Sequence, residues 1–166
     1  FSYNVSYGLH FGTNSPKDFI LFADIDGNGK YRVDGLSPST RYMDCVADTL
    51  GEQKECLEKV SIGSGISITK VRFLYNGNWS PVSGVPTFFD VIFKRSNTDA
   101  SIRYHEASVY KNQPTTPHSG PVEDCSTVDC DAVAVCLTSS QGEKKQIMIL
   151  STGQISVENI DPIGPC

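Results

Sequence analysis

The chain has 166 residues, of which 39% are hydrophobic and 20% are charged. These values exclude a disordered chain, a collagen-like chain and a coiled coil, and the length suits a single β-rich globular domain spanning residues 1–166. Lysine and arginine number 14 against 19 aspartate and glutamate residues, so the net charge of −5 argues against a nucleic-acid partner.

Short β-rich runs separated by turn residues dominate the sequence, and they predict a mainly β fold of antiparallel sheets. The alternation within Ile66–Phe73 contains one slip. Only Tyr42–Leu57 could hold a short helix, and its Gly51 weakens that interpretation. In chain order, the expected strands are Val5–Phe11, Phe19–Ile25, Lys30–Val33, Val60–Ile62, Ile66–Phe73, Phe88–Phe93, Ser101–Val109, Ala132–Leu137, Lys145–Leu150 and Ile155–Val157.

Glycine, asparagine and proline mark the connections between these strands. The run Asp26-Gly27-Asn28-Gly29 predicts a hairpin that joins Phe19–Ile25 to Lys30–Val33. Asn76-Gly77 predicts a second tight turn. Three prolines predict an internal loop over residues 111–124 rather than a linker between domains.

An even number of cysteines in a chain rich in glycine and asparagine indicates disulfides and an oxidising compartment. Local spacing favours Cys45–Cys56, and the other four could pair as Cys125–Cys130 and Cys136–Cys166. Free thiols and a zinc site are the alternatives. A zinc site lacks the usual paired spacings, and the three histidines are far apart: His10, His105 and His118.

The run that begins at Asp24 resembles a calcium-binding loop. Asp24, Asp26, Asn28 and Gly29 match loop positions 1, 3, 5 and 6 of an EF-hand, whereas position 12 is Gly35 in place of the bidentate glutamate. Asp24, Asp26 and Asn28 are therefore the candidate calcium ligands. The alternative is a tight turn whose glycines and asparagine adopt positive φ. No other cofactor is expected.

No catalytic residue is predicted, and the chain is not expected to be an enzyme. It contains neither a nucleophile elbow nor a metalloprotease motif. His105 and Glu106 are adjacent on an expected strand, so they should point to opposite faces. Lys70 and Arg72 share one strand face, which is more typical of a solvated face than of a nucleic-acid site. A secreted β-rich hydrolase is a distant alternative.

Several ordered segments resemble one family, the GspH/FimT-type pseudopilins and minor type IV pilins. In that family a YGxxF strand is followed by an LFxDxNGNGxY hairpin, and an IxI-stGqi-v segment closes the domain. The resemblance covers residues 3–35 and 133–158. The matching segments are Ser6–Phe11, Phe19–Tyr31, Val135–Ser139, Lys145–Ile149 and Ser151–Val157.

The resemblance implies a structural subunit without catalytic residues, the head of a type IV pilus or type II secretion pseudopilus protein. It implies an N-terminal hydrophobic helix that precedes this sequence, anchors the subunit in the inner membrane and makes the full-length protein α+β. Partners would be other pilin subunits, on the periplasmic or extracellular face. The alternative is a calcium-stabilised adhesive or DNA-uptake module on the cell surface. The end Asp161–Cys166 has no arginine, which argues against DNA uptake.

Overall fold

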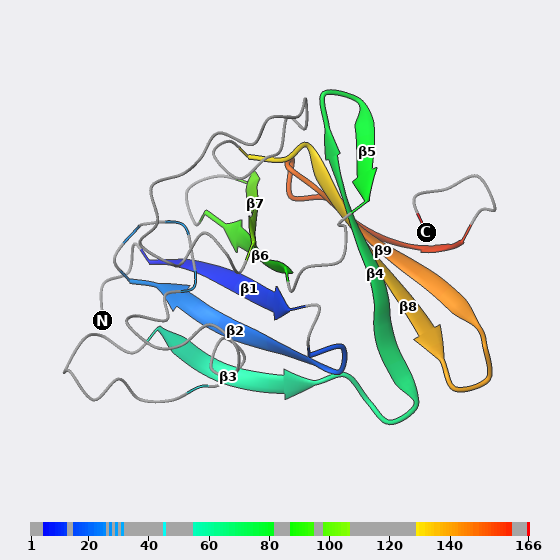
Figure 1. Cartoon of the computed structure of the whole chain (residues 1–166). Coiled ribbons are helices and arrows are strands. Elements are labelled where there is room, and N and C mark those ends of the chain that lie inside the picture. Colours follow the sequence, from blue (N-terminus) through cyan, green and yellow to red (C-terminus); the bar gives the residue numbers. More distant parts are fainter. Residues whose placement is uncertain are drawn as a thin grey trace.

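The mainly β prediction is confirmed by the fold. Every regular element in the described ranges is a β-strand, and the strands form two antiparallel sheets of five strands each (Figure 1). None of these ranges holds a helix long and apolar enough to cross a membrane. The computed structural model describes residues 5–12, 15–25, 27, 29, 31, 45, 55–81, 87–94, 98–106, 129–160 and 166.

The first sheet contains β1 (Ser6–Gly12), β2 (Asp18–Asp24), β3 (Cys56–Ser61), β6 (Thr87–Phe93) and β7 (Ala100–Glu106). Its strand order is β3-β2-β1-β6-β7, so the first strand of the chain lies at the centre. His10 on β1 therefore faces Ile20 of β2 on one side and Asp90 of β6 on the other. This register brings together residues that are 80 positions apart in the sequence.

The second sheet contains β4 (Ile66–Tyr75), β5 (Asn78–Pro81), β8 (Ala132–Ser139), β9 (Lys144–Leu150) and β10 (Ile155–Asn159). Its order is β10-β9-β8-β4-β5. The register of β4 against β8 shifts between Ile68 and Lys70, and this irregularity is the slip seen in the apolar alternation. The predicted turn at Asn76-Gly77 joins β4 to β5, with φ of 48° and 75° at its two residues.

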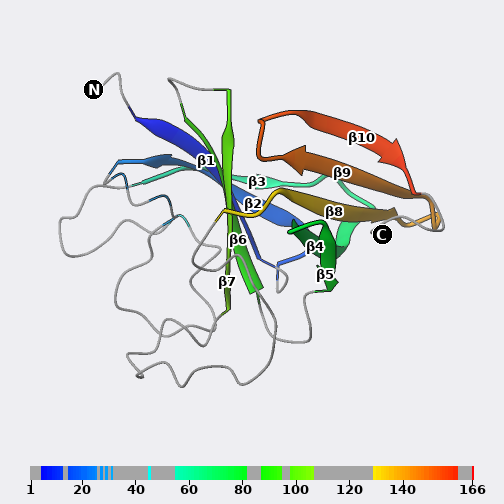
Figure 2. The ribbon, with the colours of Figure 1, turned by 90° about the horizontal axis from the view of Figure 1, so that it is seen from above.

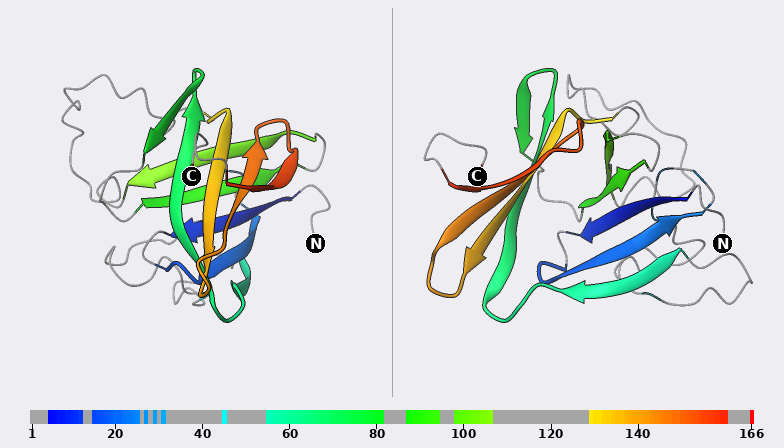
Figure 3. Two further views of the ribbon diagram at one scale, coloured as in Figure 1. Left: turned by 90° about the vertical axis from the view of Figure 1, so that its right-hand side faces the viewer. Right: turned by 180° about the vertical axis from the view of Figure 1, so that it is seen from behind.

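The two sheets cross steeply (Figure 2; Figure 3), and a shared hydrophobic core is buried between their inner faces. Phe89 lies at the centre of this core, stacked on Phe11 at 4.6 Å between ring centroids and edge-on to Phe73 at 5.6 Å. Alternating apolar residues supply the core because every second side chain of a strand points inward. Its buried members are Phe11, Ile68, Val71, Phe73, Phe89, Val91, Ala100, Ile102, Cys130, Val133, Val135 and Ile149.

The outer face of the first sheet is buried as well. Ile20, Phe22, Tyr31, Cys56 and Ile92 form a second apolar cluster there. A Cβ at position 8, on the same face, would run into the ring of Phe22, which explains a glycine in the middle of a central strand. Side chains on the outer face of the first sheet are therefore shielded from water, and a polar group among them needs a partner within the protein.

The predicted hairpin between Phe19–Ile25 and Lys30–Val33 is wrong. Both edges of β2 are already occupied, by β1 and by β3, so no edge remains for the segment after the turn. Tyr31, the described residue of that segment, lies outside any strand, and its ring packs on Phe22 at 5.4 Å. Gly27 and Gly29 have the positive φ of turn residues, but the strand that pairs with the free edge of β2 is β3, which begins after 31 intervening residues.

Two further sequence predictions concern segments of which little or nothing is described. The end of the possible helix Tyr42–Leu57 belongs to β3 at Cys56 and Leu57, and only Cys45 and Glu55 are described before that strand. The proline-rich loop at residues 111–124 lies wholly outside the described residues.

Candidate functional site

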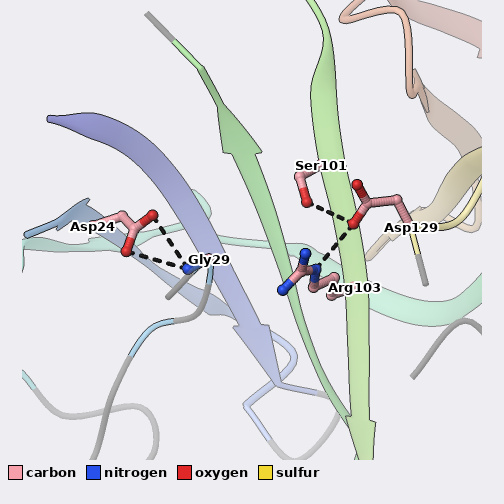
Figure 4. A network of polar contacts seen from close by, with 5 residues as sticks. All are labelled: Asp24, Gly29, Ser101, Arg103 and Asp129. Carbon is pink, nitrogen blue, oxygen red and sulfur yellow. Dashed lines mark hydrogen bonds and ion pairs between the residues drawn. The ribbon is translucent and has the colours of Figure 1, made fainter. Parts of the chain in front are cut away.

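The candidate calcium loop begins where β2 ends, and its first carboxylate is bound to the loop itself. Both carboxylate oxygens of Asp24 lie 3.3 Å from the backbone nitrogen of Gly29, which donates to them (Figure 4). Gly27 and Gly29 have φ of 72° and 74°, as expected for the tight-turn alternative. The other two candidate ligands, Asp26 and Asn28, lie outside the described residues.

The geometry of Asp24 favours a turn-stabilising role. Its side chain is 8% exposed, and a carboxylate that accepts a backbone N–H satisfies a donor that the turn would otherwise leave without a partner. Within the described ranges, no three His, Cys, Asp or Glu side chains gather closely enough to hold a metal ion. A calcium site here stays a prediction, because two of its three candidate ligands are not described.

A second polar cluster lies beside this loop on β7. Asp129 accepts hydrogen bonds from the Ser101 hydroxyl at 2.7 Å and from the Arg103 Nε at 2.9 Å (Figure 4). Burial disfavours the charged form of Asp129, but the bonds from Ser101 and Arg103 outweigh it and hold the pKa of this carboxyl below its usual range. The Arg103 guanidinium lies 3.1 Å from the position that a Cβ on Gly29 would take, so a side chain there would require the guanidinium to shift by a few tenths of an ångström.

A buried histidine–aspartate pair occupies the outer face of the first sheet. His10 Nδ1 lies 2.7 Å from Asp90 Oδ1, and the side chains are 2% and 0% exposed. The imidazole stacks on Phe88 at 5.5 Å and is tilted against Tyr31 at 4.9 Å. Its other nitrogen, Nε2, is buried and has no hydrogen-bond partner.

The Asp90 carboxylate orients the His10 imidazole, as in many catalytic sites, but aromatic rings pack against the imidazole and separate it from solvent. A carboxylate at Nδ1 fixes the tautomer and the ring position, which is also what catalytic and metal-binding histidines require. At 2% exposure, however, His10 cannot reach a substrate in this conformation. The geometry supports a structural role, in which each of the two buried side chains supplies the other with a hydrogen-bond partner on the apolar outer face of the first sheet.

Sequence reasoning missed this pair although it named His10. Asp90 was not singled out, and the two residues are brought together only by the β1–β6 register. The available signal was a single charged residue inside the apolar run Phe88–Phe93, a pattern that indicates a buried polar contact. His105 lies on β7 opposite Phe88, but the side chains of His105 and Glu106 are not described. His118 lies wholly outside the described residues.

The disulfide predictions agree with the structure where it describes them. Cys45 is bonded to Cys56, and Cys136 is bonded to Cys166, with Cα–Cα distances of 5.4 and 5.7 Å. Cys130 is also disulfide-bonded, and Cys125, its predicted partner, lies outside the described residues. The first bridge lies against the outer cluster of the first sheet, and the second ties the end of the chain to β8.

Comparison with known proteins gives no relative for this chain. No family model, no curated protein and no solved structure matches it. The function must therefore be argued from the residues and their arrangement alone.

Proposed function

We propose that this chain is the globular head of a minor pilin or pseudopilin, a structural subunit of a type IV pilus or type II secretion pseudopilus. The supporting observation is where the family-like segments lie in the fold. The YGxxF-like segment forms β1, the LFxD-like segment forms β2, and these two strands pair along six residues each. The closing segments form the contiguous β8, β9 and β10.

The covalent structure supports the same proposal. Two of the predicted disulfides clip chain segments to the sheets, at β3 and at β8. Such bridges persist in oxidising surroundings such as the periplasm or the cell exterior, where a pilin head is displayed. No group in the proposal acts as a catalyst, and the partners are other subunits of the filament.

The N-terminal strand also suits an attached anchor. β1 is the central strand of its sheet, and Tyr7, near its start, has a 49% exposed side chain. In the proposed precursor a hydrophobic helix precedes Phe1, leads into this strand and anchors the subunit in the inner membrane before assembly.

The deciding experiment reads the gene upstream of the codon for Phe1. The proposal expects a glycine cleavage site, a Phe-Thr-Leu-Ile-Glu-like start and about 20 apolar residues, enough to cross a bilayer. An ordinary secretory signal that ends directly before Phe1 would overturn it, because a freely secreted domain has no anchor for filament assembly.

A further inference from the structure

The edge strand β10 carries the two most exposed large apolar side chains of the described residues. Val157 is 68% exposed and Ile155 is 53% exposed. Both stand on the face of the second sheet that forms the core, because Ile155 lies opposite the buried Ile149 and Val157 lies opposite Ile147. The apolar inner face thus continues onto β10, where no described part of the first sheet covers it.

The other edge strands have features that discourage the addition of a further strand. β5 has four residues and ends at Pro81. β3 carries exposed Glu58 and Lys59 and a register irregularity. The edge of β7 that faces away from β6 already has a backbone hydrogen bond, because the Cys130 N–H donates to the Ile102 carbonyl. Proline, edge charges, bulges and covered edges are how proteins protect sheet edges.

β10 has fewer of these protections. Its sequence ISVEN contains no proline, lysine or arginine, its one charged residue is Glu158, and its register with β9 is regular. Among the described residues it pairs with β9 alone. Of the sheet edges that the structure describes, it is therefore the one best suited to accept another strand.

The outward-facing backbone groups of β10 follow from its bonding to β9. The Leu150 N–H donates to the Gln154 carbonyl, so Gln154, Ser156 and Glu158 direct their backbone groups toward β9. Because bonding alternates along an antiparallel strand, Ile155, Val157 and Asn159 direct theirs to the free edge. The residues with exposed apolar side chains are thus the residues that offer backbone bonds.

We propose that β10 pairs with β10 of a second copy of this chain, antiparallel about a two-fold axis at Ser156. In this register Ile155 of each copy lies opposite Val157 of the other copy, and both are hydrogen-bonded pairs. Each exposed apolar side chain then gains a cross-strand apolar partner. A two-fold contact of this kind is closed, so the assembly stops at the dimer.

The charges agree with this register. Glu158 accepts hydrogen bonds from Gln146 at 2.9 Å and Ser156 at 2.8 Å, which hold its pKa below the usual range and keep it ionised. The pairing places it opposite the exposed amide of Gln154 of the second copy rather than opposite another carboxylate. The two Glu158 side chains stand four residues apart, about 14 Å along the strands and beyond the physiological Debye length of about 8 Å.

A register centred on Val157 is less favourable. It would place Ile155 opposite Asn159, whose side chain already accepts a hydrogen bond from Lys145. One apolar side chain of each copy would then lack an apolar partner. Since the contact adds one short strand per copy, its area falls below that of a standard interface, and the dimer is expected to be weak and concentration-dependent. It does not depend on the filament proposal.

Sedimentation velocity on the 166-residue protein tests the dimer, over concentrations from about 10 µM to about 1 mM, where weak complexes form. The wild type should shift from monomer to dimer across this range. Val157→Lys places a charge on the edge and should raise the dissociation constant about tenfold or more. Leu57→Lys is the matched control, because Leu57 is 52% exposed but lies on the first sheet. The dissociation constant of this variant should equal that of the wild type.

Cysteine cross-linking tests the register. In the proposed dimer the two copies of Ser156 form a non-hydrogen-bonded pair about 4.5 Å apart at Cα, within the range of a disulfide. Ser156→Cys should therefore give a covalent dimer on mild oxidation, whereas Val157→Cys should not. Cross-linking of Val157→Cys instead would overturn the register.

Two results of the sedimentation experiment would overturn the pairing itself. A wild type that is monomeric at every concentration would show that β10 does not pair with a second copy, and a strand of a different protein would then be the partner to test. A dimer that Val157→Lys does not weaken would place the contact on another surface.

Discussion

Single residues show how this fold uses its carboxylates. Asp24 is the last residue of β2, and its carboxylate accepts a hydrogen bond from the backbone amide of Gly29, which stabilises the turn that follows the strand. Asp90 lies at the other extreme, fully buried and bound to His10. In the sequence Asp24 begins an acidic, glycine-rich run, whereas Asp90 is the single charged residue of an apolar run. The structure shows that the first carboxylate closes a turn and the second lies in the interior.

The first prediction concerns calcium at the Asp24 loop. Because Asp24 is engaged by Gly29 and position 12 is Gly35, the melting temperature should be the same within about 2 °C in excess calcium and in chelator. A real site at a hundredfold excess over its Kd would stabilise the fold by about 2.7 kcal/mol, or roughly 5–10 °C for a chain of this size. Such a rise would favour the calcium-stabilised binding module.

Asp24→Ala provides the internal control. It removes the acceptor of the Gly29 amide and should cost about 1.5–3 kcal/mol, with or without calcium. A loss that appears only in the presence of calcium would mean that the carboxylate binds the ion.

The second prediction concerns the buried pair of His10 and Asp90. His10→Phe leaves a buried carboxylate without its imidazole and should cost about 3–5 kcal/mol in urea unfolding. Asp90→Leu should cost a similar amount, because Nδ1 then loses its acceptor. The double variant should cost clearly less than the sum of the two, because both polar groups are then removed together. Additive losses would show that the two side chains are not coupled.

At the scale of strands and turns, local pattern predicted the elements well and their partners poorly. Most strands fall on the expected apolar runs, because alternation and turn residues are local signals. The exceptions are β5, which was not expected, β3, of which only the end at Val60 was expected, and Lys30–Val33, where no strand is described. Pairing is non-local: β2 pairs with β3 across a 31-residue connection, and β1 pairs with β6 across about 80 residues. The candidate loop was visible in the sequence, whereas the His10–Asp90 pair depends on register and was not.

The third prediction compares three glycines replaced by alanine. Gly63 has open space and no positive φ, so Gly63→Ala should change the free energy of unfolding little. Gly77 also has open space but a φ of 75°, so Gly77→Ala should cost about 1 kcal/mol through backbone strain alone. Gly153 has a φ of 80°, and a Cβ there would collide with the Thr98 carbonyl. Gly153→Ala should therefore lower the free energy of unfolding the most of the three.

Thermal unfolding of the three glycine variants gives the ranking directly. Equal losses at Gly77 and Gly153 would mean that the turn after β9 can move away from Thr98. Contact between that turn and the first sheet would then contribute little to stability.

At the scale of the molecule, the two crossed sheets are joined by more than their shared core. Backbone hydrogen bonds connect them at separate places, from the Ile68 N–H to the Pro16 carbonyl and from the Ala100 N–H to the Ser151 carbonyl. Composition and spacing predicted antiparallel sheets but did not distinguish one curved sheet from two packed sheets. The crossing of the two sheets depends on these corner contacts. The disulfides then fix segments that lie outside the sheets.

The last prediction compares the Cys136–Cys166 and Cys45–Cys56 bridges. They span 30 and 11 residues, and each joins one buried cysteine, Cys136 or Cys56, to a half-buried one, so the packing lost on removal is similar. If the bridges act mainly by restricting the unfolded chain, the longer loop contributes more, about 4 kcal/mol against about 3 kcal/mol. Guanidinium unfolding of Cys136→Ala/Cys166→Ala and Cys45→Ala/Cys56→Ala measures both losses. A larger loss at the shorter loop would mean that the Cys45–Cys56 bridge acts mainly by holding its segment against the outer cluster of the first sheet.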